Sequence, residues 1–368
     1  MMLFGLGIGL SLMTTAQPPD GLRPLAEKLK LNLGAAVRSD YLQQDLDGGQ
    51  YQKSILENYT MIEPENDLKP PALWQGVGKY DFSKTDFFVD WAMKHKMKVR
   101  GHVLLYASDN GYTIPRWLLN MEKEITPQQA KTMLHDYIIS VAGRYKGKIM
   151  AWDVINEAIE DRPNTNPFNL RSSFWFRKLG VDFVEFAFRF AHEADPKCKL
   201  YYNDYSVENG GAKADNLLKM VDYLISKKVP IDGIGLQFHR WMVEKPVPGD
   251  KFYAMLSQIQ KRKLSFMMTE FDLSMPITRL PPTDPNFGLV PMNPEDLQYQ
   301  AESYGAFVKM ALSFKNCQGI QLWGVNDRHS WIPSSTGGGR GAALLLDKVY
   351  KPKPAYTAFA DALKGARR

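Results

Sequence analysis

The sequence predicts an α/β protein that folds as one (β/α)8 TIM barrel. Eight short apolar runs alternate with segments whose apolar residues recur about every 3.6 positions, the pattern of parallel strands joined by helices. Eight such units are the number that closes a barrel. An open doubly wound sheet is disfavoured because no glycine-rich phosphate loop follows the first run. The 368 residues suit a single barrel domain.

The strand-like runs also share a polarity. They span residues 31–37, 59–66, 98–106, 149–158, 199–206, 232–239, 264–273 and 319–327. The helical patterns between them include residues 83–95, 127–145, 173–193, 212–226 and 295–313. Almost every run begins apolar and ends in carboxylates, amides or histidine. Because the carboxyl ends of barrel strands and the loops after them build the active site, these ends are the expected functional face.

The charge balance gives no support to a nucleic-acid partner. The chain has 46 Lys and Arg against 40 Asp and Glu, a net charge of +6. Its basic residues are spread along the sequence, whereas nucleic-acid binding usually shows a clustered basic patch. A mildly basic surface would suit an anionic polysaccharide.

Cysteine and histidine usage predicts no metal site, and we expect no cofactor. Cys198 and Cys317 each lie just before a predicted strand and are too few for a disulfide framework or a zinc site, so buried free thiols are expected. His95, His135 and His192 fall in predicted helices without the spacing of metal ligands. We expect them to be surface or packing residues.

Residues 1–16 resemble a secretory signal peptide. Leu3 to Met13 form an apolar run, and small residues up to Ala16 offer a cleavage site before Gln17, although the usual basic start is missing. The run is shorter than the roughly 20 residues that a membrane-spanning helix needs. The sequence therefore predicts a catalytic domain over residues 17–368 that is secreted or periplasmic, with no membrane span.

Two glutamates stand at strand ends that would face each other. Glu157 ends the fourth run and Glu270 belongs to the polar end of the seventh, on opposite sides of a closed eight-stranded barrel. Two carboxyl groups that flank a glycosidic bond can hydrolyse it. One protonates the leaving oxygen, and the other attacks the sugar or activates a water. Glycoside hydrolysis is the chemistry that this pair predicts.

The two carboxyl groups need different protonation states. His239 ends the neighbouring sixth run, and a charged imidazole there would hold Glu270 ionised. Asp272 is expected to orient His239. Glu157 would then feel the negative charge of Glu270 and keep its proton, as a general acid must.

Eight stretches make a resemblance to a known family specific. They occur in one order over residues 31–356 and read EPENDLK (63–69), RGH (100–102), WDVINEA (152–158), YYNDYS (201–206), IDGIGLQFH (231–239), TEFDL (269–273), LWGVNDRHSW (322–331) and KPKPAY (351–356). In content and order they resemble the xylanases of glycoside hydrolase family ten. The resemblance implies endo-hydrolysis of β-1,4-xylosidic linkages in xylan with retention of configuration.

The resemblance also implies a role for each matching residue. Glu157 corresponds to the acid/base and Glu270 to the nucleophile. The implied sugar-binding positions are Glu65, Asn66 and Lys69 on the glycone side, His102 at the cleavage point, Asn156 and Gln237 around its 2-hydroxyl, Tyr205 on the leaving-group side, and Trp323 and Trp331 as aromatic walls. Aromatic rings that pack on sugar CH faces and fixed polar groups that bind hydroxyls make this set chemically coherent.

One segment departs from the family pattern. After RGH the family usually continues TLVWHSQ, whereas this chain reads VLLYASDN over residues 103–110. Tyr106, Ala107 and Asp109 thus replace a tryptophan, a histidine and a glutamine. A smaller wall, a lost ring and an acceptor-only carboxylate are expected to alter the glycone side of the cleft.

Two other functions remain open at this stage. The same mechanism could act on another β-glycan or on decorated or short xylo-oligosaccharides. A non-catalytic carbohydrate-binding barrel is the alternative from a different class, supported only by the altered 103–110 segment; retention of Glu157, Glu270 and His239 argues against it. For the leading hypothesis, a xylanase, we expect a polysaccharide substrate and a monomer.

Overall fold

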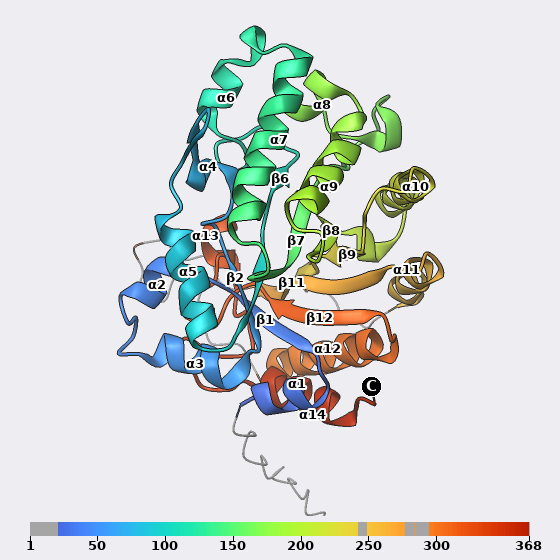
Figure 1. Ribbon diagram of the computed structural model, residues 1–368. Helices are drawn as coiled ribbons and strands as arrows, with labels where there is room; N and C mark the ends of the chain where they lie inside the picture. The colour runs from blue at the N-terminus through green and yellow to red at the C-terminus, as the bar shows by residue number, and fades with distance from the viewer. Residues whose placement is uncertain (1–20, 242–248, 277–282, 284–293, 368) are drawn as a thin grey trace, which may run out of the picture.

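Eight parallel strands close into a barrel that is surrounded by helices (Figure 1). The structure, a computed structural model, describes residues 21–241, 249–276, 283 and 294–367. The predicted signal peptide lies outside the described residues. Among the described helices, none is both long and apolar enough to cross a membrane. The single-domain (β/α)8 barrel predicted from the sequence is confirmed.

The barrel strands follow the predicted order. They are β1 (Asn32–Val37), β2 (Met61–Pro64), β5 (Lys98–Gly101), β7 (Ile149–Asn156), β8 (Lys199–Asp204), β9 (Gly233–Leu236), β11 (Ser265–Pro276) and β12 (Cys317–Leu322). Each pairs in parallel with the next, and β1 also pairs with β12, which closes the circle. All six residues of β1 are buried, as expected of a strand covered on both faces.

The helices alternate with these strands. The longer ones are α3 (Gln50–Asn58), α5 (Ser83–Lys94), α7 (Pro127–Arg144), α9 (Asp182–Ala194), α10 (Ala212–Ser226), α11 (Asp250–Lys261), α12 (Pro294–Ser313) and α14 (Pro354–Gly365). Local sequence explains where α7 begins. Thr126 and Gln129 form a capping box, and Pro127 occupies the first helical position, where its missing N–H costs nothing.

Short elements fill the connections that follow the barrel strands. They are α2 (Ser39–Gln43), α4 (Pro70–Leu73), β3 (Trp74–Gly76), β4 (Lys79–Tyr80), β6 (Leu105–Tyr106), α6 (Arg116–Asn120), η1 (Glu122–Glu124), η2 (Pro167–Asn169), α8 (Phe174–Leu179), η3 (Val207–Asn209), β10 (His239–Trp241), η4 (Asp327–His329), α13 (Ile332–Ser335) and β13 (Arg340–Gly341). A further short helix, α1 (Arg23–Lys28), precedes the barrel.

The third predicted strand is two strands. The run 98–106 divides into β5 and β6, and both pair with β7. Between them His102 bonds to the Asp153 side chain, and the Leu104 N–H bonds to the Asp153 carbonyl. Hydrophobicity could not reveal the break, because Val103, Leu104 and Leu105 are all buried. Cys317 is the first residue of β12 rather than preceding it. Both cysteines are buried, as predicted, and Cys198 is a free thiol.

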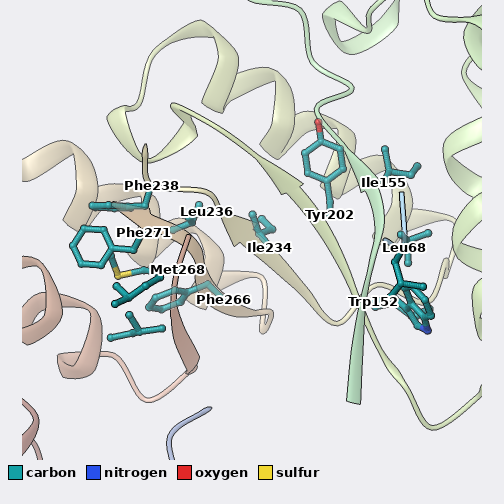
Figure 2. Packing of buried hydrophobic residues seen from close by; sticks show 14 of the residues in the cluster. Leu68, Trp152, Ile155, Tyr202, Ile234, Leu236, Phe238, Phe266, Met268 and Phe271 are labelled. Carbon is teal, nitrogen blue, oxygen red and sulfur yellow. The ribbon is translucent and has the colours of Figure 1, made fainter. Parts of the chain in front are cut away.

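Apolar side chains fill the space between barrel and helices. Figure 2 shows part of this core, with Phe238 and Phe271 close together beside Met268. The Phe238 and Phe271 ring centroids are 5.2 Å apart in an edge-to-face arrangement. A second, smaller cluster of buried residues comprises Met61, Ala151, Tyr201 and Met267. Glycines in neighbouring strands give these side chains room: a Cβ at Gly233 would lie 2.4 Å from the Tyr201 ring.

A charged network lies beneath the carboxyl ends of the strands. The fully buried Arg100 donates to Glu63 at 2.6 Å and to both carboxylate oxygens of Asp153. Asp153 also binds Nδ1 of His102 at 2.9 Å. Because a buried charge is tolerated only when it is paired and hydrogen-bonded, this network fixes β2, β5 and β7 relative to one another.

Candidate active site

The carboxyl ends of the barrel strands surround a cavity of about 730 Å³. Its lining residues are Lys69, His102, Tyr106, Glu157, Tyr205, Ser206, Asn209, Gln237, His239, Arg240, Trp241, Glu270, Trp323 and Trp331. Most of the predicted site residues are therefore brought together on this one face.

Four predicted residues do not line the cavity. Asn156 and Asp272 are buried beneath it and act through hydrogen bonds to residues that do. Glu65 and Asn66 lie beside Lys69: the Asn66 amide donates to Glu65 at 3.2 Å, and the Lys69 ammonium donates to Asn66 at 2.9 Å. These contacts connect Glu65 and Asn66 to a residue that does line the cavity.

Glu270 is buried and fully engaged by donors. Its Oε1 accepts a hydrogen bond from the Asn203 amide at 2.7 Å, and its Oε2 lies 3.0 Å from His239 Nε2. Burial alone would raise the pKa of Glu270, but the hydrogen bond and charge of His239 outweigh it and lower the pKa to about 2. Glu270 is therefore an ionised carboxylate, the form that a nucleophile requires.

His239 lies between two carboxylates. Its Nδ1 is 2.8 Å from Asp272, whose same oxygen accepts a hydrogen bond from Trp331 Nε1 at 3.1 Å. Burial acts to lower the pKa of His239, but Asp272 and Glu270 together raise it to about 10. Both ring nitrogens are thus protonated and donate, as expected for an imidazolium that holds Glu270 charged.

Glu157 has a different environment. It follows β7 directly and adopts a left-handed backbone conformation with φ of 55°, a strained geometry that is found at functional sites. Its Oε1 accepts hydrogen bonds from the Tyr106 hydroxyl at 2.6 Å and from the Gln237 amide at 2.9 Å. Both donors are neutral, whereas Glu270 faces a cation.

A chain of amides connects the two glutamates. The Asn203 amide donates to Glu270 and, at 2.8 Å, to Asn156 Oδ1. Asn156 Oδ1 also accepts from Gln237 Nε2 at 3.2 Å, and the same nitrogen donates to Glu157. Asn203 was not among the predicted site residues. It lies in the YYNDYS stretch at the polar end of β8, which is the signal that could have identified it.

Aromatic side chains form the walls of the cavity. The Trp331 and His239 ring centroids are 4.9 Å apart, and those of Trp323 and His102 are 5.4 Å apart. The Lys69 ammonium lies 5.9 Å from the Trp323 ring centroid. This arrangement offers flat apolar faces next to charged and hydrogen-bonding groups, as a sugar site requires.

Tyr205, another residue of the cavity wall, is held by charged neighbours. Its hydroxyl bonds to Asp161 and accepts from Arg171 at 2.6 Å, while the Lys213 ammonium lies 3.2 Å from its ring centroid. Lys213 also pairs with Asp204 at 3.0 Å. The ring is thereby fixed at the cavity wall.

Some lining residues were not predicted. Ser206, Asn209, Arg240 and Trp241 come just after the ends of β8 and β9. They belong to η3, β10 and the residue before η3. Residues just after barrel strands are expected to build the active site. Only the folded loops, however, decide which of these side chains enter the cavity.

The three replaced positions of the 103–110 segment lie differently with respect to the cavity. Tyr106 lines it, whereas Ala107 is buried in the core at 1% exposure. Asp109 instead accepts hydrogen bonds from the Phe174 N–H at 2.9 Å and from Arg177 at 2.7 Å, which anchors α8. Ala107 and Asp109 thus do not line the cavity themselves, and an altered glycone side from the loss of the histidine and glutamine stays a prediction.

One buried trio has the spacing of metal ligands. Ligand atoms of Glu63, His102 and Asp153 lie within 4.8 Å of one another. Arg100, however, donates to both carboxylates, so a guanidinium cation is already paired with each of them. The donor set fits an internal ion-pair network better than a metal site.

Comparison with known proteins finds relatives that belong to one family. A family model for glycosyl hydrolase family 10 matches residues 21–362. The chain is 31% identical over 343 residues to endo-1,4-beta-xylanase B of Thermotoga neapolitana, covering 93% of this chain and 91% of that protein. It is 36% identical over 313 residues to a beta-1,4-xylanase of Dictyoglomus thermophilum, covering 83% and 82%.

Solved structures agree with this likeness. Xylanase 10B from Thermotoga petrophila RKU-1, determined in complex with xylobiose, superposes with a TM-score of 0.83 at 32% identity, over 94% of this chain and 97% of that one. Xylanase 10B from Thermotoga maritima gives 0.82 at 32% identity, over 94% and 98%.

Proposed function

The chain belongs to glycosyl hydrolase family 10, and from this premise we propose that it is an endo-1,4-β-xylanase. It hydrolyses internal xylosidic bonds of xylan with retention of configuration. The single observation that carries the proposal is the opposite setting of two carboxyl groups in one cavity: Glu270 against an imidazolium, and Glu157 against neutral donors. Environments that separate two carboxyl groups in this way assign the acid and the nucleophile.

The reaction follows in two steps. In the first, the ionised Glu270 attacks the anomeric carbon while the proton of Glu157 passes to the leaving oxygen, which gives a covalent glycosyl-enzyme and the free leaving chain. In the second, Glu157, now a carboxylate, takes a proton from water as that water attacks the anomeric carbon and releases Glu270. Glu157 ends the cycle protonated.

The surrounding residues support this assignment. His239 and Asn203 hold both oxygens of Glu270, so the carboxylate is oriented before substrate arrives. Trp323 and Trp331 provide faces for sugar rings, and Asn209 and Arg240 provide donors at the cavity wall. Orientation and electrostatic preorganisation of this kind supply much of an enzyme's rate acceleration.

Paired variants test the proposal. Glu270→Ala should lower the rate of reducing-sugar release from xylan by at least about three orders of magnitude, because no covalent intermediate can form. Glu157→Ala should lower it by about 10²–10⁴-fold, the contribution typical of general acid catalysis. Assays on glucuronoxylan, arabinoxylan and β-glucan define the substrate. Equal hydrolysis by wild type and Glu270→Ala would refute the mechanism, and turnover of β-glucan alone would refute the substrate.

We propose, in addition, that the enzyme is exported and works as a monomer in the extracellular or periplasmic space. The apolar run Leu3 to Met13 and the small residues before Gln17 support removal of residues 1–16. Amino-terminal sequencing and light scattering of the exported protein test both points. A retained Met1 or a dimer mass would contradict them.

A further inference from the structure

Tyr106 contacts the acid/base directly, and no role for it follows from the two-glutamate mechanism. All hydrogen bonds that the described residues make to the Glu157 side chain go to Oε1: from Tyr106 at 2.6 Å, from Gln237 at 2.9 Å and from Asn156 Nδ2 at 3.4 Å. On the basis of the proposed function, we propose that Tyr106 is a positioning residue that occupies Oε1 and leaves the transferable proton of Glu157 on Oε2.

The direction of these hydrogen bonds is fixed from the nucleophile. An ionised Glu270 can only accept, so it must face the NH₂ group of Asn203. The same NH₂ group then donates to Asn156 Oδ1, and this oxygen in turn faces the NH₂ group of Gln237. Gln237 therefore donates to Glu157 Oε1, which cannot carry a proton pointing at that donor.

Tyr106 completes this arrangement because its position is rigid. Within the β6–β7 pair it lies opposite Asn156, and the Ala107 N–H bonds to the Asn156 carbonyl at 3.0 Å. Burial raises the pKa of Tyr106 far above its usual range. The phenol is thus protonated and available to donate at every working pH.

The other charged groups near Glu157 stay in place when the phenol is removed. Asp204 on β8 and Arg171 before α8 interact with it electrostatically. Glu270 and His239 line the same cavity from β11 and β10, as does His102 beyond β5. A Tyr106→Phe variant keeps all five and the aromatic ring, so its effect reports the hydroxyl alone.

The first test needs no turnover. The pKa of Glu157 is followed by ¹³C NMR of labelled glutamate carboxyl groups in the free enzyme, with the signal assigned by its loss in Glu157→Gln. A hydroxyl that donates to a carboxylate favours the charged form, so Tyr106→Phe should raise this pKa by roughly 1 unit. Tyr112→Phe, at a tyrosine that is 85% exposed in the same connection, is the matched control and should leave it unchanged.

The second test separates positioning from a general structural role. The alkaline limb of kcat/KM, which reports the acid, should move up with the pKa of Glu157. Xylo-oligosaccharides have a poor leaving group that needs the proton of Glu157. At pH values below the alkaline limb, Tyr106→Phe should therefore lower their kcat/KM by about tenfold, which corresponds to a transition-state cost of about 1.4 kcal/mol for the misplaced proton. An aryl xylobioside with an acidic phenol leaving group needs no proton and should be unaffected.

The outcomes are distinguishable. An unchanged or lowered pKa of Glu157 in Tyr106→Phe, or an equal loss on both substrates, overturns the role of Tyr106. A wild type that cleaves neither substrate refutes the proposed function instead, and the NMR titration still decides whether Tyr106 controls the Glu157 carboxyl.

Discussion

At the scale of single residues, the charge on Glu270 depends on His239. Glu270 is buried, which by itself would favour the neutral acid, yet its pKa lies at about 2 because the imidazolium of His239 and the amide of Asn203 stabilise the carboxylate. Asp272 stabilises the imidazolium in turn. Three side chains from β10 and β11 thus form one electrostatic unit.

This unit predicts a specific pH dependence. Glu270 has a lowered pKa when folded, so its contribution to stability is present above about 4.5 and is lost as the pH falls through about 2. His239 has a raised pKa, so its contribution is present below about 6.5 and is lost as the pH rises through about 10. The difference in unfolding free energy between wild type and His239→Asn should therefore be largest between about pH 4.5 and 6.5.

The pH–rate profile of His239→Asn should differ from that of wild type on its acid side. Without the imidazolium the pKa of Glu270 rises, so the acid limb of kcat/KM moves to higher pH. Denaturation series and pH–rate profiles measure the two effects. An acid limb at the wild-type position would show that His239 does not set the charge of Glu270.

At the scale of elements, close packing between strands depends on glycines. Gly101 lies opposite Trp152 in the β5–β7 pair, and a Cβ there would be 2.2 Å from the indole ring. Trp152 is 1% exposed and belongs to the hydrophobic core. Glycine at the end of β5 thus leaves space for the Trp152 ring of β7. The next residue, His102, lines the cavity.

A pair of glycine substitutions tests this packing. Gly101→Ala should destabilise the protein by about 1–3 kcal/mol through overpacking. Gly143→Ala, in α7 with open space around the new Cβ, should stabilise it by about 0.5–1 kcal/mol because alanine is the better helix former. Urea denaturation compares both with wild type. Similar effects of the two substitutions would rule out the steric argument.

At the scale of the whole molecule, the first and last parts of the described barrel domain meet. The first and last barrel strands pair from Asn32 and Gly319 to Ala35 and Leu322. Outside the barrel, the buried Asn58 Oδ1 accepts from the Leu22 N–H at 3.1 Å and from the Tyr356 hydroxyl at 2.7 Å. One amide thus connects α3 to both terminal segments.

Loss of this amide should weaken the entire fold. Asn58→Ala leaves two buried donors without their acceptor and should cost about 1–3 kcal/mol. Tyr356→Phe removes one of the two bonds, so the double variant should cost less than the sum of the single ones. Equilibrium unfolding of wild type, the two single variants and the double variant measures these free energies. Strict additivity would mean that Asn58 and Tyr356 do not interact energetically.

Residue pattern alone indicated the barrel and a pair of facing glutamates, and the resemblance to a known family supplied the sugar-binding positions. Alternation of strands and helices is a local property, and a closed parallel barrel places every polar strand end on one face. Glu157, Glu270 and His239 could therefore be assigned to one site before any coordinates were known. Asn203 was within reach of the same rule, because it lies at the polar end of β8.

Only the tertiary structure decided what depends on direction and distance. Hydropathy does not separate residues 103–105 from the strand before them. In the structure β5 ends before His102, whose side chain bonds to Asp153. Ala107 and Asp109 adjoin Tyr106 in sequence, yet one enters the core and the other anchors α8. Which atom of Glu157 meets Tyr106 is set by pairing between β6 and β7, since contacts between segments about 50 residues apart follow from packing and not from local sequence.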